Sequence, residues 1–182
     1  MRKLFALILA LSLALPTWVA AQDYGLEQRY ADQELSFDYP VGWLATVITD
    51  GILVMPLPSN TVSDEPDVLM LTFVKPSNSS KGMAAWPLNS DIVFLLGYVT
   101  CEMVSGFTED GEHVEYGEIE TSIVGGKEFT SVAFEGQEMS GSVTAIEQDG
   151  RRLFALVVGT TRTFTEQEPL IKQIVQSVEF KG

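Results

Sequence analysis

The sequence predicts an α+β fold in which an antiparallel β-sheet is flanked by helices. Three pairs of short alternating segments are joined by glycine-containing turns, which is typical of antiparallel hairpins. Two other segments carry apolar residues at helical spacing. The one cysteine, Cys101, excludes an internal disulfide, so a hydrophobic core must stabilise the fold. We divide the 182 residues into a signal peptide (1–21), a lead-in segment (22–34) and a single domain (35–182).

The first 21 residues have the pattern of a secretory signal peptide. Two basic residues precede the apolar run Leu4–Leu15, and small residues lead up to Ala21, after which we expect cleavage. The run is shorter than the roughly 20 residues needed to span a bilayer, and no second run of that kind follows. Residue 22 is glutamine, not the lipid-accepting cysteine of a bacterial lipoprotein. We therefore expect a secreted or periplasmic protein with no membrane association after cleavage.

The domain begins with "FDYPVGW", Phe37–Trp43. The alternating residues that should face inward from its first strand are Leu35, Phe37 and Tyr39. Pro40 presets φ for a tight turn that ends at Gly42, after which Trp43 begins the returning strand. We predict that these aromatic side chains belong to the core and close one end of the sheet. The alternative is an exposed aromatic binding site.

Hairpins are predicted at Asp50-Gly51, Gly125-Gly126 and Asp149-Gly150. In order, they join Trp43–Thr49 to Ile52–Leu57, Tyr116–Val124 to Lys127–Phe134, and Ser142–Gln148 to Arg151–Val158. The segments Leu153–Val158 and Val68–Val74 are apolar at both alternating sets of positions, so they are predicted to be central strands. Polar and apolar residues alternate in Tyr116–Val124, which predicts a peripheral strand with one wet face.

Two helices are predicted to cover the sheet. The first spans Ser90–Val104, ends before Gly106 and carries the apolar stripe Ile92, Leu95, Leu96, Val99 and Met103. The second begins with Thr165 and Glu168 as a capping box and carries Leu170, Ile171, Ile174, Val175 and Val178. The last segment, Ser177–Phe180, either extends this helix or pairs as an edge strand.

The charge balance is strongly acidic. The chain has 25 acidic and 11 basic residues, and cleavage after Ala21 removes two of the basic ones, which changes the formal charge from −14 to −16. Nucleic acids are bound through lysine and arginine, so an acidic surface argues against a nucleic-acid partner. Acidity of this kind is typical of solubility rather than of a particular partner. We expect a monomer.

Candidate catalytic and metal-binding residues are few. A serine or cysteine nucleophile needs a nearby histidine, and His113 is the single histidine of the chain. His113 lies in a polar turn, whereas Cys101 lies in the first predicted helix and is expected to be a buried small hydrophobe. His113 with Glu112 and Glu115 has the chemistry for part of a metal site, but paired cysteines or histidines at zinc-site spacing are absent. We predict no catalytic residue, no metal and no cofactor.

A surface anchor for a partner is predicted in the segment "KGMAAWPLN", residues 81–89. Met83 and Trp86 lie there between turn residues, just before the first predicted helix. Large apolar side chains exposed in such a loop are typical partner contacts. The alternative, which we favour for Trp86, is that its side chain folds back over the N-terminus of the helix as a hydrophobic staple.

Several motifs together resemble the PsbP-like domains. "FDYPVGW" is similar to the F-x-Y-P-x-x-W opening of that family, and "GGKEFTSVAFEG", "RRLFALVVGTT" and "EPLIKQIVQSVEF" resemble its middle and closing segments. The resemblance covers residues 35–180. It implies an α/β/α sandwich like that of photosystem II extrinsic subunits and a Ran-binding import factor. It also implies a function like that of the known members, which are chiefly non-enzymatic binding, assembly or stabilising factors.

Two functions follow as hypotheses. The first is an exported, non-catalytic binding or assembly module whose protein or small-molecule partner is unknown. The alternative is a carboxylate- or metal-dependent hydrolase that uses His113 and neighbouring acidic residues. A polar cleft that gathers His113 with two or more carboxylates would favour the hydrolase, and an apolar groove beside Trp86 would favour the binding module.

Overall fold

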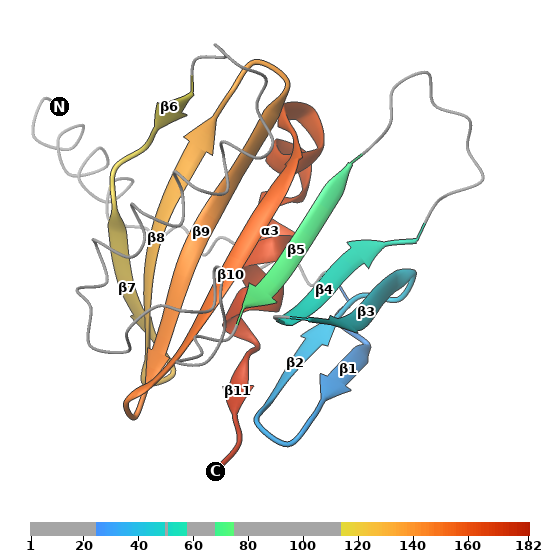
Figure 1. Ribbon diagram of the computed structural model, residues 1–182, viewed down its shortest axis with the longest axis vertical. Coiled ribbons are helices and arrows are strands. Elements are labelled where there is room, and N and C mark those ends of the chain that lie inside the picture. The colour runs from blue at the N-terminus through green and yellow to red at the C-terminus, as the bar shows by residue number, and fades with distance from the viewer. Residues whose placement is uncertain (1–24, 50, 58–67, 75–113) are drawn as a thin grey trace, which may run out of the picture.

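The computed structural model describes residues 25–49, 51–57, 68–74 and 114–182. This part of the chain forms two antiparallel sheets and helix α3 (Thr161–Gln176) (Figure 1). The broad prediction of an α+β fold with an antiparallel sheet is confirmed. The first predicted helix, Ser90–Val104, lies outside the described residues. Strands therefore dominate the described fold, with α3 on one face of the larger sheet.

The larger sheet has eight strands in the order β3-β4-β5-β10-β9-β8-β6, with β7 also paired to β8. Their bounds are β3 (Trp43–Ile48), β4 (Gly51–Pro56), β5 (Leu69–Val74), β6 (Glu115–Tyr116), β7 (Glu120–Val124), β8 (Lys127–Glu135), β9 (Met139–Gln148) and β10 (Arg151–Thr160). Strand β10 lies between β5 and β9 and is buried on both faces from Leu153 to Val158. The prediction of central strands at β5 and β10 is thus confirmed.

The smaller sheet joins segments from distant parts of the chain. Strand β2 (Leu35–Tyr39) pairs with β1 (Gln28–Ala31) on one side and with β11 (Glu179–Phe180) on the other. Strand β1 lies in the predicted lead-in segment, where the sequence did not predict a strand. Strand β11 decides between the two alternatives for the last segment, because it pairs as a strand and does not extend the helix.

The stretch Phe37–Trp43 confirms one prediction and corrects another. Phe37 is fully buried, stacks on Tyr30 and packs at a tilt against Phe73, with ring centroids 5.1 and 4.6 Å apart, so the aromatic residues belong to the core. The turn runs one residue further than predicted: the Trp43 amide donates to the Pro40 carbonyl over 3.3 Å, and Gly42 has a φ of +85°. Glycine is therefore at the third position, as a type II turn requires. The two strands do not pair, because β2 and β3 belong to different sheets.

Two of the three predicted hairpins have the predicted turn. Gly125 and Gly126 connect β7 to β8 with φ of 59° and 77°, and Asp149 and Gly150 connect β9 to β10 with φ of 51° and 74°. Positive φ at both central residues is the type I′ turn, whose twist matches that of the flanking strands. These local signals were sufficient to place both turns.

The third hairpin has a different turn from the predicted one. Ile48 pairs with Gly51, so Gly51 is the first residue of β4 and not a turn residue. Glycine is required there by close approach, since a Cβ atom would lie 1.9 Å from the Phe73 carbonyl oxygen on β5. The sequence pattern identified the glycine correctly but assigned it the wrong role.

Helix α3 begins earlier than predicted. Its N-cap is Thr160, whose Oγ1 accepts a hydrogen bond from the Thr163 amide at 3.4 Å, so Thr165 lies inside the helix and does not cap it. The predicted apolar stripe is confirmed, because its members inside the helix are buried: Leu170, Ile171, Ile174 and Val175. Val178, just beyond the helix, is also buried.

The large sheet has apolar residues on both faces. On the α3 side, the main core includes Phe37, Phe73 and Ile146. On the opposite side, a second buried cluster includes Val143, Phe154 and Val158. Alternation along β8, β9 and β10 supplies both clusters, because successive side chains of a strand point to opposite faces.

Candidate functional site

The predicted partner anchor and the alternative catalytic residues are not placed by the structure. Met83, Trp86, Cys101 and His113 all lie outside the described residues. Of the acidic residues considered with His113, Glu115 is described, and it lies exposed on β6 opposite Glu135. The anchor at Met83 and Trp86 and the hydrolase alternative therefore stay predictions.

A groove lies on the α3 side of the large sheet. Helix α3 packs against β10, β9 and β5 and against β2 of the smaller sheet (Figure 1). It does not extend over the β7 side of the same face, so a wedge-shaped space remains between the helix and β7, β8 and β9. Its volume is about 470 Å³. We call this space the α3 groove.

The floor of the α3 groove is made of small side chains, several of which carry hydroxyl groups. The residues that line it from β8 and β9 on this face are Ser131, Ala133, Ser142 and Thr144. The hydroxyl oxygens of Ser131 and Thr144 are 3.0 Å apart and share a hydrogen bond. Where the same strands carry Phe129 and Ile146, the main core fills the space between sheet and helix. The groove therefore exists because the side chains become small along β8 and β9.

The wall and the rim of the α3 groove differ in polarity. The wall is the apolar stripe of the helix, with Ile171 and Val175 buried and Phe164 half-buried. Three exposed glutamates lie along the rim: Glu118, Glu120 and Glu168. Among the described residues, Lys172 is the one positively charged side chain that lines the groove. An apolar wall, hydroxyl groups on the floor and a mostly acidic rim suit binding of a ligand with both apolar and cationic parts.

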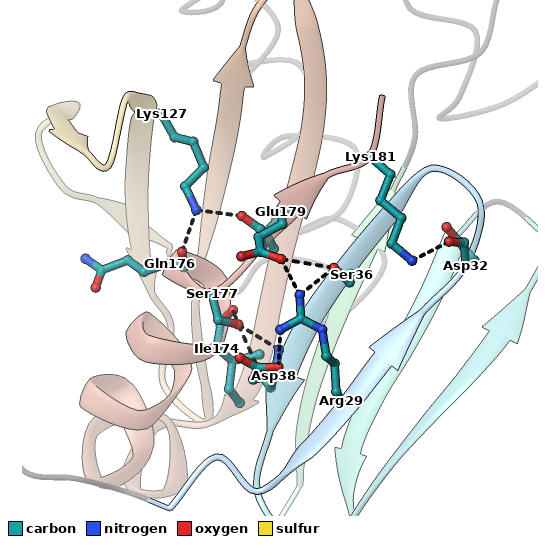
Figure 2. Close-up of polar contacts among 11 residues, drawn as sticks. Arg29, Asp32, Ser36, Asp38, Lys127, Ile174, Gln176, Ser177, Glu179 and Lys181 are labelled. Carbon is teal, nitrogen blue, oxygen red and sulfur yellow. Dashed lines mark hydrogen bonds and ion pairs between the residues drawn. The ribbon is translucent and has the colours of Figure 1, made fainter.

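A polar cluster joins the three strands of the smaller sheet to the C-terminal end of α3 (Figure 2). Arg29 on β1 forms an ion pair with Asp38 at 3.1 Å, another with Glu179 on β11, and a hydrogen bond to the Ser36 hydroxyl at 2.9 Å. The Asp38 amide donates to the hydroxyl of Ser177, the C-cap residue of α3, over 2.8 Å. Because these charges already have partners within the protein, we interpret the cluster as structural.

Lys127 lies half-buried at the edge of this cluster. Its ammonium donates to the carbonyl oxygens of Gln176 and Val178, at 2.8 and 2.6 Å, next to the C-terminal end of α3 (Figure 2). Burial lowers the pKa of Lys127 from its ordinary value, and the nearby charge of Glu179 opposes that shift. A cation at this position complements the partial negative charge of the helix end. Lys127 therefore stabilises the end of α3.

The described residues offer hydrogen-bonding groups in the α3 groove and no cluster of metal-ligating side chains. In this part of the chain, no three or more histidine, cysteine, aspartate or glutamate side chains come together as they would around a metal ion. The side chains on the floor of the α3 groove offer hydroxyl groups as hydrogen-bond donors and acceptors. A hydroxyl group becomes an effective nucleophile only beside a general base.

The sequence interpretation missed the groove residues. The available signal was the run of small residues at alternate positions, Ser131 and Ala133 on one strand and Ser142 and Thr144 on the next. The same alternation elsewhere in the sheet carries large apolar residues. To recognise the gap, however, the register of β8 against β9 and the position of α3 have to be known.

Comparisons with known proteins give a fold and no close relative. Neither a protein-family model nor a curated protein matches this sequence. Among solved structures, the chain has the fold of PsbP-like proteins, which confirms the resemblance noted in the sequence. One matching structure is the solution structure of cyanobacterial PsbP (CyanoP) from Synechocystis sp. PCC 6803. The TM-score is 0.55 at 14% sequence identity, and the match covers 84% of this chain and 91% of CyanoP.

Within residues 25–49, 51–57, 68–74 and 114–182, no helix has both the length and the hydrophobicity needed to cross a bilayer.

Proposed function

We propose that this protein is an exported, non-catalytic binding or assembly module that holds part of its partner in the α3 groove. The observation that carries the proposal is the groove itself, with its apolar wall and hydroxyl-bearing floor. Its volume of about 470 Å³ is within the range of roughly 300–1,000 Å³ typical of ligand pockets. The resemblance to PsbP-like domains, with their binding and assembly roles, supports the same function.

The proposal is tested by filling the groove. Ala133 is exposed, lines the floor and lies on β8, so the change Ala133→Trp adds a large side chain with little demand on the core. Ala133→Ser is the matched control, because a hydroxyl group preserves the open space. Each variant is cross-linked in the exported fraction, and the recovered proteins and small molecules are identified by mass spectrometry. We expect Ala133→Trp to lose a partner that wild type and Ala133→Ser both retain, and equal recovery by all three would overturn the proposal.

The anchor at Met83 and Trp86 is a second proposed contact with the partner, independent of the groove. Its support is the position of two large apolar residues among turn residues. Trp86→Ala should reduce recovery of the same partner if the side chain is an exposed anchor. Unchanged recovery, together with a loss of stability, would identify Trp86 as a staple over a helix.

We also propose that the predicted helix Ser90–Val104 supplies the second layer of an α/β/α sandwich. The support is the buried cluster on the sheet face opposite α3, which includes Val143 and Phe154 at 0% and 1% exposure. The chain leaves this cluster at Val74 and returns to it at Val114, so the intervening residues begin and end beside it.

The second layer is tested by a charge on the predicted apolar stripe. Val99→Asp should lower the free energy of unfolding by about 3 kcal/mol or more, because it buries an unpaired carboxylate. Val99→Thr is the matched control, because it adds a polar group without a charge at the same position, and it should cost clearly less. Urea unfolding of both variants measures the difference, and equal stability would contradict the proposed layer.

A further inference from the structure

Strand β7 presents an open edge beside the α3 groove. It pairs with β8 on one side and with no described strand on the other (Figure 1). All five residues of β7 are exposed, including Ile123 at 74% and Val124 at 40%. Edge strands of natural sheets usually carry protection against pairing, often lysine or proline. Residues 115–124 contain neither.

The exposed edge of the sheet is regular along β7 but irregular between β6 and β7. Tyr116 pairs with Phe134 and Glu120 pairs with Ser131, so four steps along the edge strand match three steps along β8. One extra residue is therefore present between β6 and β7, which is a β-bulge. A bulge bends an edge away from new partners, so β7 alone, Glu120–Val124, remains a straight edge.

The register of the hairpin identifies which backbone groups of β7 face outward. Val124 and Lys127 flank the two-residue turn and form the pair that exchanges backbone hydrogen bonds. By alternation, the amide and carbonyl groups of Thr121 and Ile123 point away from β8. The hydroxyl groups of Thr121 and Thr130 lie 3.3 Å apart, as expected for the closer, non-hydrogen-bonded type of pair. A new strand would bond to Thr121 and Ile123.

The charge of the edge selects the kind of strand that can bind. Residues 115–124 contain three glutamates and no lysine or arginine. Glu118 and Glu120 also lie on the rim of the α3 groove, with Glu168 opposite them on the helix. A second copy of this chain would bring two acidic edges together, which like-charge repulsion disfavours. A cationic segment would be attracted by the same carboxylates.

We propose that β7 receives an extended, cationic peptide segment of another protein as an added strand. This inference rests on the proposed function, because the added strand runs along the α3 groove. Backbone hydrogen bonds to Thr121 and Ile123 supply affinity. Basic side chains of the segment pair with Glu118 and Glu120, and its apolar side chains on the other face cover Ile123.

The proposal is tested with a synthetic peptide of about ten residues in which lysine alternates with valine, long enough for one added strand. Hydrogen exchange of the native protein is followed amide by amide. We expect the peptide to slow exchange at Thr121 and Ile123, and we expect no effect from a peptide with glutamate in place of lysine. No slowing at these two amides, or equal slowing by the acidic peptide, would overturn the proposal.

Two variants separate the backbone contact from the charge contact. Ile123→Pro removes an outward amide and leaves the bonds between β7 and β8 in place, so it should abolish peptide binding, whereas Ile123→Thr should retain it. The double change Glu118→Lys and Glu120→Lys should weaken binding by roughly tenfold, as expected from the loss of two exposed ion pairs. Tight binding to Ile123→Pro would show that no strand is added and would overturn the proposal.

Failure of this inference can be distinguished from failure of the proposed function. The cross-linking experiment is repeated with Ile123→Pro beside Ala133→Trp. Loss of the partner in both variants supports the added strand. Loss in Ala133→Trp alone overturns the added strand and leaves the groove as the binding site. Retention in both overturns the two proposals together.

Discussion

Gly51 shows how one residue controls the joining of two strands. Its backbone lies against the Phe73 carbonyl on β5, where a Cβ atom would be 1.9 Å from the oxygen. We predict that Gly51→Ala lowers the free energy of unfolding by about 2 kcal/mol or more, because β4 and β5 must separate to admit a methyl group. Chemical denaturation measures the change. Gly117→Ala is the control, since its nearest contact would be an ordinary 3.7 Å, and an equal loss in both variants would refute this explanation.

Lys127 makes the free energy of unfolding depend on pH. Burial lowers its pKa in the folded protein, so between that pKa and the ordinary value of about 10.4 the unfolded chain binds more protons. The contribution of Lys127 to stability is therefore smaller below this window and increases as the pH rises through it. The effect is modest, because the side chain is only half-buried.

We test this by comparing wild type with Lys127→Met in urea at pH values below and within the window. As the pH rises, the unfolding free energy of wild type should increase relative to that of Lys127→Met. Lys172→Met, at an exposed position on α3, should show no such trend. A difference that shrank with rising pH would contradict the assignment.

At the scale of elements, β2 connects the smaller sheet to the main core. Phe37 is fully buried and contacts rings from β1 and β5. Phe37→Ala should cost about 3–5 kcal/mol of unfolding free energy, as is typical when a buried ring is removed. Val41→Ala, two residues beyond β2, should cost less than about 0.5 kcal/mol because Val41 is 62% exposed. Thermal or urea unfolding distinguishes these outcomes, and a small effect at Phe37 would mean that the aromatic cluster contributes little.

The elements predicted well from sequence are those specified by local chemistry. Gly125-Gly126 and Asp149-Gly150 define their turns through residues that tolerate positive φ, and the apolar stripe of α3 defines its buried face. The pairing of β2 was predicted wrongly. Its partner β11 is chosen by tertiary contacts, whereas β1 precedes it across a short turn in which the Asp32 carboxylate accepts from the Glu34 and Leu35 amides, a local signal that was missed. A turn residue such as Gly42 reverses the chain but does not determine whether the flanking strands pair.

At the scale of the whole molecule, the α3 groove is a property of several elements at once. Small residues on β8 and β9 create it only because α3 crosses the sheet beside them. The sequence contains those residues but not the position of the helix relative to them. The fold was therefore predictable in outline from its periodicity and its resemblance to PsbP-like domains, and the groove was not.

The proposed export concerns the whole chain and gives a direct prediction. When the full sequence is expressed in a bacterium with a secretory pathway, the mature protein should begin at Gln22. The reason is that an apolar run too short to span a bilayer is followed by small residues up to Ala21, which is the pattern of a signal-peptide cleavage site. Mass spectrometry of the extracytoplasmic fraction identifies the N-terminus. A protein that keeps Met1 and remains in the cytoplasm would contradict the predicted signal peptide.

The smaller sheet has a consequence for how such a chain matures. Strand β2 cannot complete its pairing until β11 is present, and Ser36 and Glu179, which face each other there, are separated by 143 positions in the sequence. Contacts between such distant positions form late, because a long loop must close first. A polypeptide threaded amino end first through a translocation channel would keep this sheet unfinished until nearly all of it had emerged. Under the proposed export, the smaller sheet would thus be completed only when transport is almost finished.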